Sequence, residues 1–149
     1  MSPKVLTPQE AHALLTANPA VVYIDVRTVA EFASSHPRGK VVNIPIVFHH
    51  PTTKDTFPNN SFLLVLEDLY TKDIALVIGC DTGERASQAA LQLLEAGYTD
   101  VAVMQEGFAG WRKLKLPATG DNRAGISYVS LLTKVKRKGK KKTIQASAH

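Results

Sequence analysis

Cys80 is the residue of this 149-residue sequence whose surroundings best suit a nucleophile. It follows the apolar run 74–79 directly and precedes the short polar stretch 81–85, after which helical spacing begins at Ala86. Gly83 lets this stretch turn tightly, so that successive backbone N–H groups can converge on one point. The N–H groups and the dipole at the start of the next helix face the same point. We therefore expect a loop that stabilises negative charge on the Cys80 sulfur.

The opposing interpretation is that Cys80 is a small buried hydrophobic residue, which is the commoner role of a single cysteine at the end of a strand. The loop context favours the nucleophile. Cys80 is the only cysteine of the sequence, so it can form neither an internal disulfide nor a multi-cysteine metal site. Any chemistry it performs must use one sulfur atom.

Strand and helix patterns alternate along the chain, and this alternation determines where the loop should lie. Two capping boxes, Thr7–Glu10 and Thr28–Glu31, predict the starts of two helices. Apolar runs predict strands at 21–25, 41–44, 74–79 and 101–104, and helical spacing predicts helices at 62–70, 86–96 and 108–114. The pattern predicts an open parallel α/β sheet with helices on both faces. Ligands bind beyond the carboxyl ends of the strands in such sheets, and Cys80 falls there.

Four motifs of the sequence resemble those of the rhodanese family and occur in the family's order. Cys80 to Arg85 matches the active-site loop C-x-x-G-x-R. The other three are 24–32, similar to "DVR…E(F/Y)", 39–45, similar to "G-x-x-N-I-P", and 106–111, similar to "GG-x-x-x-W" with Glu106 in place of the first glycine. The match runs from about Thr7 to Pro117. It implies a rhodanese-like open five-stranded parallel sheet, with a short additional strand near Lys4.

The resemblance also implies a sulfur transfer in two steps. Cys80 would take a sulfane sulfur from a donor such as thiosulfate and become a persulfide. It would then pass this sulfur to cyanide or to a thiol, including a thiol on a protein. The substrate-binding residues implied are Asp81, Thr82, Gly83, Glu84, Arg85 and Ala86. No metal, no organic cofactor and no general-base histidine is implied, because the loop itself would stabilise the thiolate.

The sequence leaves the electrostatics of this loop open. Asp81 and Glu84 place two carboxylates beside Cys80 against one arginine, Arg85. They should weaken the attraction of a dianionic donor, unless both side chains point into solvent. Arg85 could bind a substrate sulfonate or phosphate, or it could brace the loop. The long polar segment 46–60 could wall one side of the entrance or be a passive surface loop.

Other polar residues near the motifs are interpreted as structural. Asp25, Arg27 and Glu31 resemble a charge cluster that supports the site in this family. The adjacent His49 and His50 lie in a polar segment without a third metal ligand at useful spacing, so they are interpreted as solvated.

Two other functional classes fit the same fold. A related group of cysteine-dependent phosphatases has five residues between its Cys and Arg, whereas four residues separate Cys80 from Arg85. The other class is a non-catalytic sulfur-carrier or interaction domain with this fold. Interaction domains of this kind usually lack the cysteine, which is present here. The sulfurtransferase is therefore the favoured function.

The basic residues of the chain are concentrated near its C-terminus. Seven of the nine residues from Lys134 to Lys142 are Lys or Arg, and without them 11 basic residues face 13 acidic ones. We predict a rhodanese domain at 1–119, an extension at 120–133 that packs on it, and a basic disordered tail at 134–149. The basic run could contact a polyanion weakly, although a solvated tail is favoured.

The sequence also bears on location. No apolar run approaches the roughly 20 residues that span a bilayer, and the residues after Met1 form no apolar signal segment. We expect a cytoplasmic protein.

Overall fold

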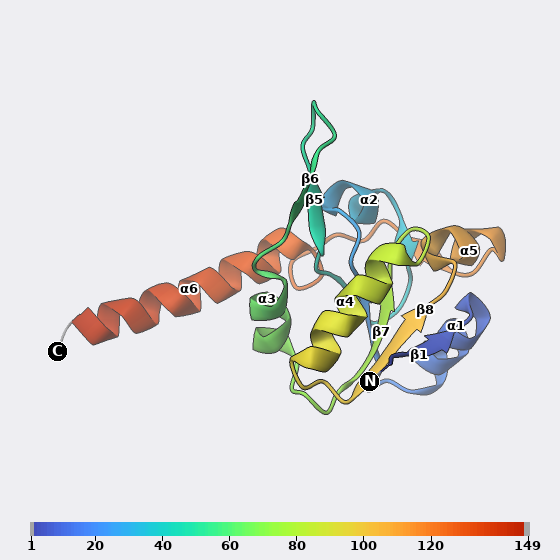
Figure 1. Cartoon of the computed structure of the whole chain (residues 1–149), viewed down its shortest axis with the longest axis horizontal. Helices are drawn as coiled ribbons and strands as arrows, with labels where there is room; N and C mark the ends of the chain where they lie inside the picture. The colour runs from blue at the N-terminus through green and yellow to red at the C-terminus, as the bar shows by residue number, and fades with distance from the viewer. Residues whose placement is uncertain (1, 148–149) are drawn as a thin grey trace.

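A parallel five-stranded sheet forms the centre of the computed structural model, which describes residues 2–147 and the side chains of residues 2–139. The spatial order of the strands is β1-β8-β7-β2-β4, and every pairing among them is parallel. Their bounds are β1 Lys4–Leu6, β2 Val22–Asp25, β4 Val41–Asn43, β7 Ala75–Gly79 and β8 Asp100–Met104. The predicted fold, including the short first strand, is confirmed (Figure 1).

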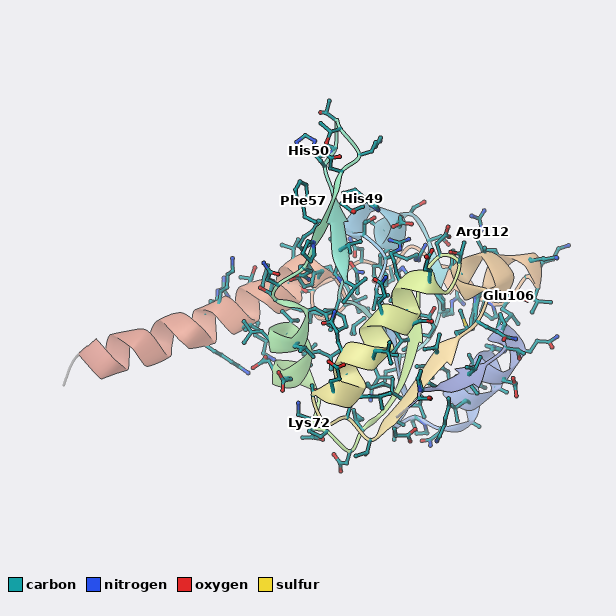
Figure 2. All side chains as sticks on the ribbon, viewed as in Figure 1. His49, His50, Phe57, Lys72, Glu106 and Arg112 are labelled. Atoms are coloured by element: carbon teal, nitrogen blue, oxygen red, sulfur yellow. The ribbon has the colours of Figure 1, made fainter. Side chains whose placement is uncertain are left out.

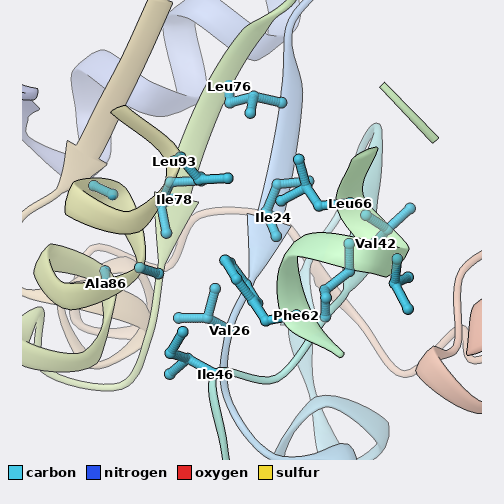
Figure 3. Close-up of a cluster of buried hydrophobic side chains, with 14 of the residues drawn as sticks. Ile24, Val26, Val42, Ile46, Phe62, Leu66, Leu76, Ile78, Ala86 and Leu93 are labelled. Atoms are coloured by element: carbon cyan, nitrogen blue, oxygen red, sulfur yellow. The ribbon is translucent and has the colours of Figure 1, made fainter. Parts of the chain in front are cut away.

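Helices cover both faces of this sheet. On one face lie α1 Pro8–Ala17, α2 Val29–Ser34 and α5 Gly107–Lys113, and on the other α3 Phe62–Leu69 and α4 Glu84–Glu95. Figure 3 shows the second face, where Ile78 of β7 and Ile24 of β2 meet Phe62 of α3 and Leu93 of α4. Neighbouring residues of β7 face opposite cores, which is why this strand reads as a continuous apolar run.

Both predicted capping boxes are present. Thr7 accepts from the Glu10 N–H while Glu10 accepts from the Thr7 N–H, and Thr28 and Glu31 make the same reciprocal pair. The helix after Cys80 begins two residues earlier than predicted, at Glu84. This shift places the first turn of α4 inside the loop.

Residues 47–60 differ from the long polar connection that the sequence predicts. They form an antiparallel hairpin of β5 Val47–His49 and β6 Thr56–Pro58, which stands out from the body of the molecule (Figure 1). Its strands are short, exposed and partly polar, so their pairing leaves no apolar alternation in the sequence. A second pair that sequence patterns miss joins β3 His36–Pro37 to β9 Ala118–Thr119.

The C-terminal region forms one long helix that continues beyond the predicted extension at 120–133. Helix α6 runs from Tyr128 to Ser147. Tyr128, Leu131 and also Val135 are buried, so contacts with the domain continue past the predicted boundary at residue 133. Physically, Val135 lies one turn beyond Leu131 and extends the same apolar face. The disorder predicted for the tail stays a prediction, and the side chains of Lys140 to Lys142 lie outside those described.

None of the helices within residues 2–147 has the length and apolar character of a membrane-spanning segment.

Candidate active site

Cys80 lies where the chain leaves the central strand β7 and turns into α4. The turn is made at Gly83, whose φ of 109° is in the left-handed region that favours glycine. The backbone N–H of Gly83 lies 3.0 Å from the Cys80 Sγ, and that of Ala86 lies 3.3 Å from it. Ala86 is in the first turn of α4, where N–H groups have no partner within the helix. The sulfur therefore sits at a helix N-terminus with two N–H donors directed at it.

The rest of the loop lies at the surface. Asp81, Thr82 and Glu84 are exposed, whereas Ala86 is buried and Cys80 itself is 1% exposed. The structure thus brings Cys80, Gly83 and Ala86 together around the sulfur and leaves the two predicted carboxylates at the rim. Their charges act on this site from solvent-exposed positions.

Arg85 braces the loop through a carboxylate rather than through carbonyl oxygens. Its two terminal nitrogens donate to the two oxygens of Glu31, at 3.0 and 3.2 Å. The backbone N–H and hydroxyl of Thr28 also donate to Glu31. Burial alone would raise the pKa of Glu31, but the hydrogen bonds from Arg85 and Thr28 lower it to about 2. The arginine of the loop is therefore paired with a fully ionised partner at neutral pH.

Asp25 and Arg27 form a second, separate pair beneath the sheet edge. The Arg27 Nε and terminal nitrogen donate to the Asp25 carboxylate, the shorter contact being 2.7 Å. Burial raises the pKa of Asp25, and the contacts with Arg27 oppose that rise. The Arg27 guanidinium lies 4.4 Å from the centre of the Phe108 ring. The predicted charge cluster is thus divided into two pairs, since Glu31 bonds Arg85 and not Arg27.

Helix α5 fixes the other side of the loop, a role that the sequence analysis did not anticipate. The N–H of Phe108 donates to the Cys80 carbonyl at 2.7 Å, and that of Ala109 to the Asp81 carbonyl at 3.2 Å. A Cβ on Gly107 would collide with both carbonyls, and Gly107 has a φ of 56°. The sequence signal for this contact is Gly107, which belongs to the motif at 106–111.

The sequence analysis placed Asn43 in a strand and did not predict a role for its side chain. Its side-chain amide donates to the carbonyls of Asp25 and Arg27, both at 3.0 Å. These bonds hold the turn that follows β2 and thereby position the neighbouring ion pairs. The sequence signal for this role is that Asn43 is a polar residue within an otherwise apolar strand.

The hairpin forms one wall of a hollow beside α2. A cavity of about 550 Å³ lies between the start of α2 and the hairpin, lined by Thr28, Val29, Ala30, Phe48, His49, His50, Pro51 and Lys54. Figure 2 shows His49 and His50 on the hairpin. Across the part of the chain that the structure describes, no three His, Cys, Asp or Glu residues are grouped so as to hold a metal ion.

The fold and the loop geometry define an α/β protein with a cysteine cradled at a strand-to-helix turn, and comparison identifies its family. Residues 7–114 match the family described as Rhodanese-like domain, and the chain belongs to this family. It is 33% identical over 117 residues to thiosulfate sulfurtransferase GlpE of Haemophilus influenzae strain PittEE, covering 78% of this chain and 95% of that protein. It is also 33% identical over 107 residues to thiosulfate sulfurtransferase 16, chloroplastic, of Arabidopsis thaliana, covering 72% and 85%.

Solved structures show the same fold. Rv0390 from M. tuberculosis superimposes with a TM-score of 0.68 at 25% identity, covering 81% of this chain and all of that one. A protein from Rhodopseudomonas palustris, titled a possible tyrosine phosphatase, superimposes with a TM-score of 0.57 at 23% identity, covering 78% and 85%. At this identity the second likeness shows the fold alone.

Some relatives are longer than this chain or carry organelle names. The chain spans about half the length of several curated relatives, including senescence-associated protein DIN1 of Raphanus sativus, with 34% identity over 95 residues. Names such as thiosulfate sulfurtransferase 16, chloroplastic, place relatives in an organelle. The cytoplasmic location stays a prediction.

Proposed function

We propose that this protein is a sulfurtransferase that carries a sulfane sulfur as a persulfide on Cys80. The observation that carries the proposal is the pair of N–H groups, from Gly83 and Ala86, directed at the Cys80 Sγ at the start of α4. Such donors stabilise a negative sulfur, which is needed both when the thiolate attacks and when the persulfide is held. The relatives named thiosulfate sulfurtransferase support the same reaction class.

The reaction with thiosulfate and cyanide proceeds in two displacements. The Cys80 thiolate attacks the outer sulfur of thiosulfate, an S–S bond forms, and the S–S bond to the sulfonate group breaks with departure of sulfite and its electron pair. Cyanide then attacks the outer sulfur of the persulfide, forming thiocyanate, and Cys80 leaves as the thiolate. No net redox change occurs on the protein, and a thiolate acceptor would follow the same second step.

Residues at different positions in the loop would have different roles. The N–H groups of Gly83 and Ala86 bind the reacting sulfur, while Asp81, Thr82 and Glu84 form the rim that a donor crosses. Arg85 acts through its pair with Glu31 and holds the loop against α2. Because that pair neutralises the arginine and two exposed carboxylates remain, the rim favours donors with less negative charge than thiosulfate.

The loop length argues against a phosphatase. Four residues separate Cys80 from Arg85, one fewer than the five between Cys and Arg in the related phosphatases. Moreover, the arginine that would hold a phosphate is already bonded to both oxygens of Glu31.

The proposal is tested with Cys80→Ser. This change is nearly isosteric, but a serine alkoxide is not accessible at neutral pH, so thiocyanate formation should fall below detection. The thermal midpoint should stay close to that of the wild type. Mass spectrometry after incubation with thiosulfate should show one added sulfur on the wild type and none on the variant. A folded variant that retains most of the activity would refute the mechanism.

A further inference from the structure

Helix α6 is anchored at its start and then leaves the domain. Tyr128 and Leu131 are 3% exposed and Val135 is 8% exposed, and they pack with the core beside α3. The Tyr128 hydroxyl accepts a hydrogen bond from the Asn59 side chain at 3.0 Å, which ties α6 to the base of the hairpin. Figure 1 shows the rest of the helix running away from the sheet. The packed turns therefore hold the following turns outside the body of the domain.

The turns that leave the domain carry an unusual concentration of cations. Seven of the residues 134–142 are Lys or Arg, and no Asp or Glu occurs after Asp121. Lys134, Lys136 and Arg137 are exposed. Within residues 2–139, the ion pair found for this run joins Lys138 to Asp68 at 3.0 Å. The remainder of the chain has 11 basic and 13 acidic residues, so the net positive charge of the protein comes from this run.

The distribution of these cations around α6 indicates what they would bind. At about 100° per residue, the four cations at 134, 136, 137 and 138 span more than half of the helix circumference, and Val135 and Gly139 lie on the remaining side. An interfacial membrane helix needs an apolar face along the same length. Here the apolar side chain among positions 134–139 is Val135, which is already buried. A polyanion that reaches several sides of a helix fits better than a flat lipid surface.

We propose that α6 binds the phosphate backbone of a nucleic-acid duplex. A helix of about 10–12 Å diameter fits a major groove about 12 Å wide, where cations on both flanks reach both phosphate strands. The slight negative charge of the remaining domain disfavours contacts elsewhere, so binding is restricted to the helix. Neither Cys80 nor its loop takes part, and this inference stands independently of the proposed sulfur transfer.

The test measures binding of the full chain to a fluorescent DNA duplex and to an RNA hairpin with a stem of equal length. Fluorescence anisotropy is followed between about 50 and 200 mM salt. The α6 variant is Lys134→Gln with Lys136→Gln and Arg137→Gln. The matched control is Lys54→Gln with Lys113→Gln and Lys115→Gln, which removes three exposed cations outside α6. All six positions are exposed, and thermal unfolding checks that both variants remain folded.

The α6 variant should lose at least tenfold in affinity at the lower salt concentration. Its slope of log affinity against log salt should become shallower by about 0.9 for each lost phosphate contact. The control should stay within about twofold of the wild type. Binding of the DNA duplex, alone or together with the RNA hairpin, supports the proposal. Binding of the RNA hairpin alone would contradict it, because the major groove of an RNA helix is too narrow for α6. Equal losses in both variants, no binding to either duplex, or α6-dependent binding only to phosphatidylserine-containing vesicles would overturn it.

Discussion

Two arginine–carboxylate pairs lie close to the Cys80 loop, and they differ mainly in burial. In the Arg27–Asp25 pair the side chains are 5% and 1% exposed, whereas in the Arg85–Glu31 pair they are 23% and 32% exposed. The buried pair holds the turn after β2 and is almost completely shielded from solvent. The outer pair joins the Cys80 loop to α2. The same two chemical groups therefore support the fold in one place, and under the proposed function they would set the charge that a donor meets in the other.

The largest predicted effect breaks the buried pair. Arg27→Met removes the guanidinium but keeps an apolar stem beside Phe108. The buried Asp25 carboxylate then keeps the hydrogen bond from the backbone N–H of residue 27 but loses its cationic partner. We expect a loss of about 3–5 kcal/mol in the free energy of unfolding. Arg85→Met, the matched change in the outer pair, should cost about 1 kcal/mol or less because water screens it. Urea denaturation of both variants makes the comparison, and equal losses would show that burial does not separate the two pairs.

A second prediction uses pH to separate the pairs. The folded pKa of Glu31 is about 2, below its ordinary 4.5, so its stabilising effect is present above pH 4.5 and is lost as the pH falls toward 2. Asp25 has a raised folded pKa, so its ionisation costs stability as the pH rises through its titration. In Glu31→Gln the side-chain carbonyl oxygen can still accept the capping-box hydrogen bond from the Thr28 N–H. This variant should unfold at a lower temperature than wild type at pH 6.

This difference in melting temperature should shrink between pH 4.5 and 2. The exposed Glu95 provides the control, because Glu95→Gln should leave the pH profile close to that of wild type. A gap for Glu31→Gln that is constant with pH would mean that the outer pair does not stabilise the fold through its charge.

The smallest predicted effect concerns the rim charges that the outer pair leaves uncompensated. Asp81→Asn with Glu84→Gln should lower the KM for thiosulfate by up to about fivefold for each carboxylate removed. This corresponds to about 1 kcal/mol or less per charge. Two carboxylates elsewhere, changed in Asp55→Asn with Glu95→Gln, serve as the control. Steady-state kinetics at low ionic strength gives the most sensitive comparison. An unchanged KM would show that the acidic rim is incidental to donor choice.

Sequence patterns predicted the features that depend on neighbours in the chain. The apolar runs gave the central strands, the capping boxes gave the starts of α1 and α2, and the position of Gly83 gave the turn beside Cys80. Features that depend on residues far apart in the sequence could not be predicted from these patterns. Arg85 and Glu31 are 54 residues apart, and neither residue type at that separation predicts a pair.

The hairpin and the full length of α6 were not predicted for a different reason. The hairpin strands pair through the backbone with little burial, so they carry no alternation of apolar and polar residues. Among the described side chains of α6, which end at residue 139, the last buried one is Val135. The lysine-rich turns beyond it resemble a disordered tail by composition.

The burial of Cys80 has a kinetic consequence. A side chain that is 1% exposed cannot be touched by a donor unless part of its surroundings moves. The carbonyls of Cys80 and Asp81 are tied to α5, and Gly83 is bonded to the sulfur and to Ser87, so an opening would begin at the exposed Thr82. Under the proposed function, sulfur exchange would occur during brief local openings, at a rate proportional to the fraction of time that the loop is open. The same openings would limit how fast peroxide or an alkylating reagent reaches the thiol.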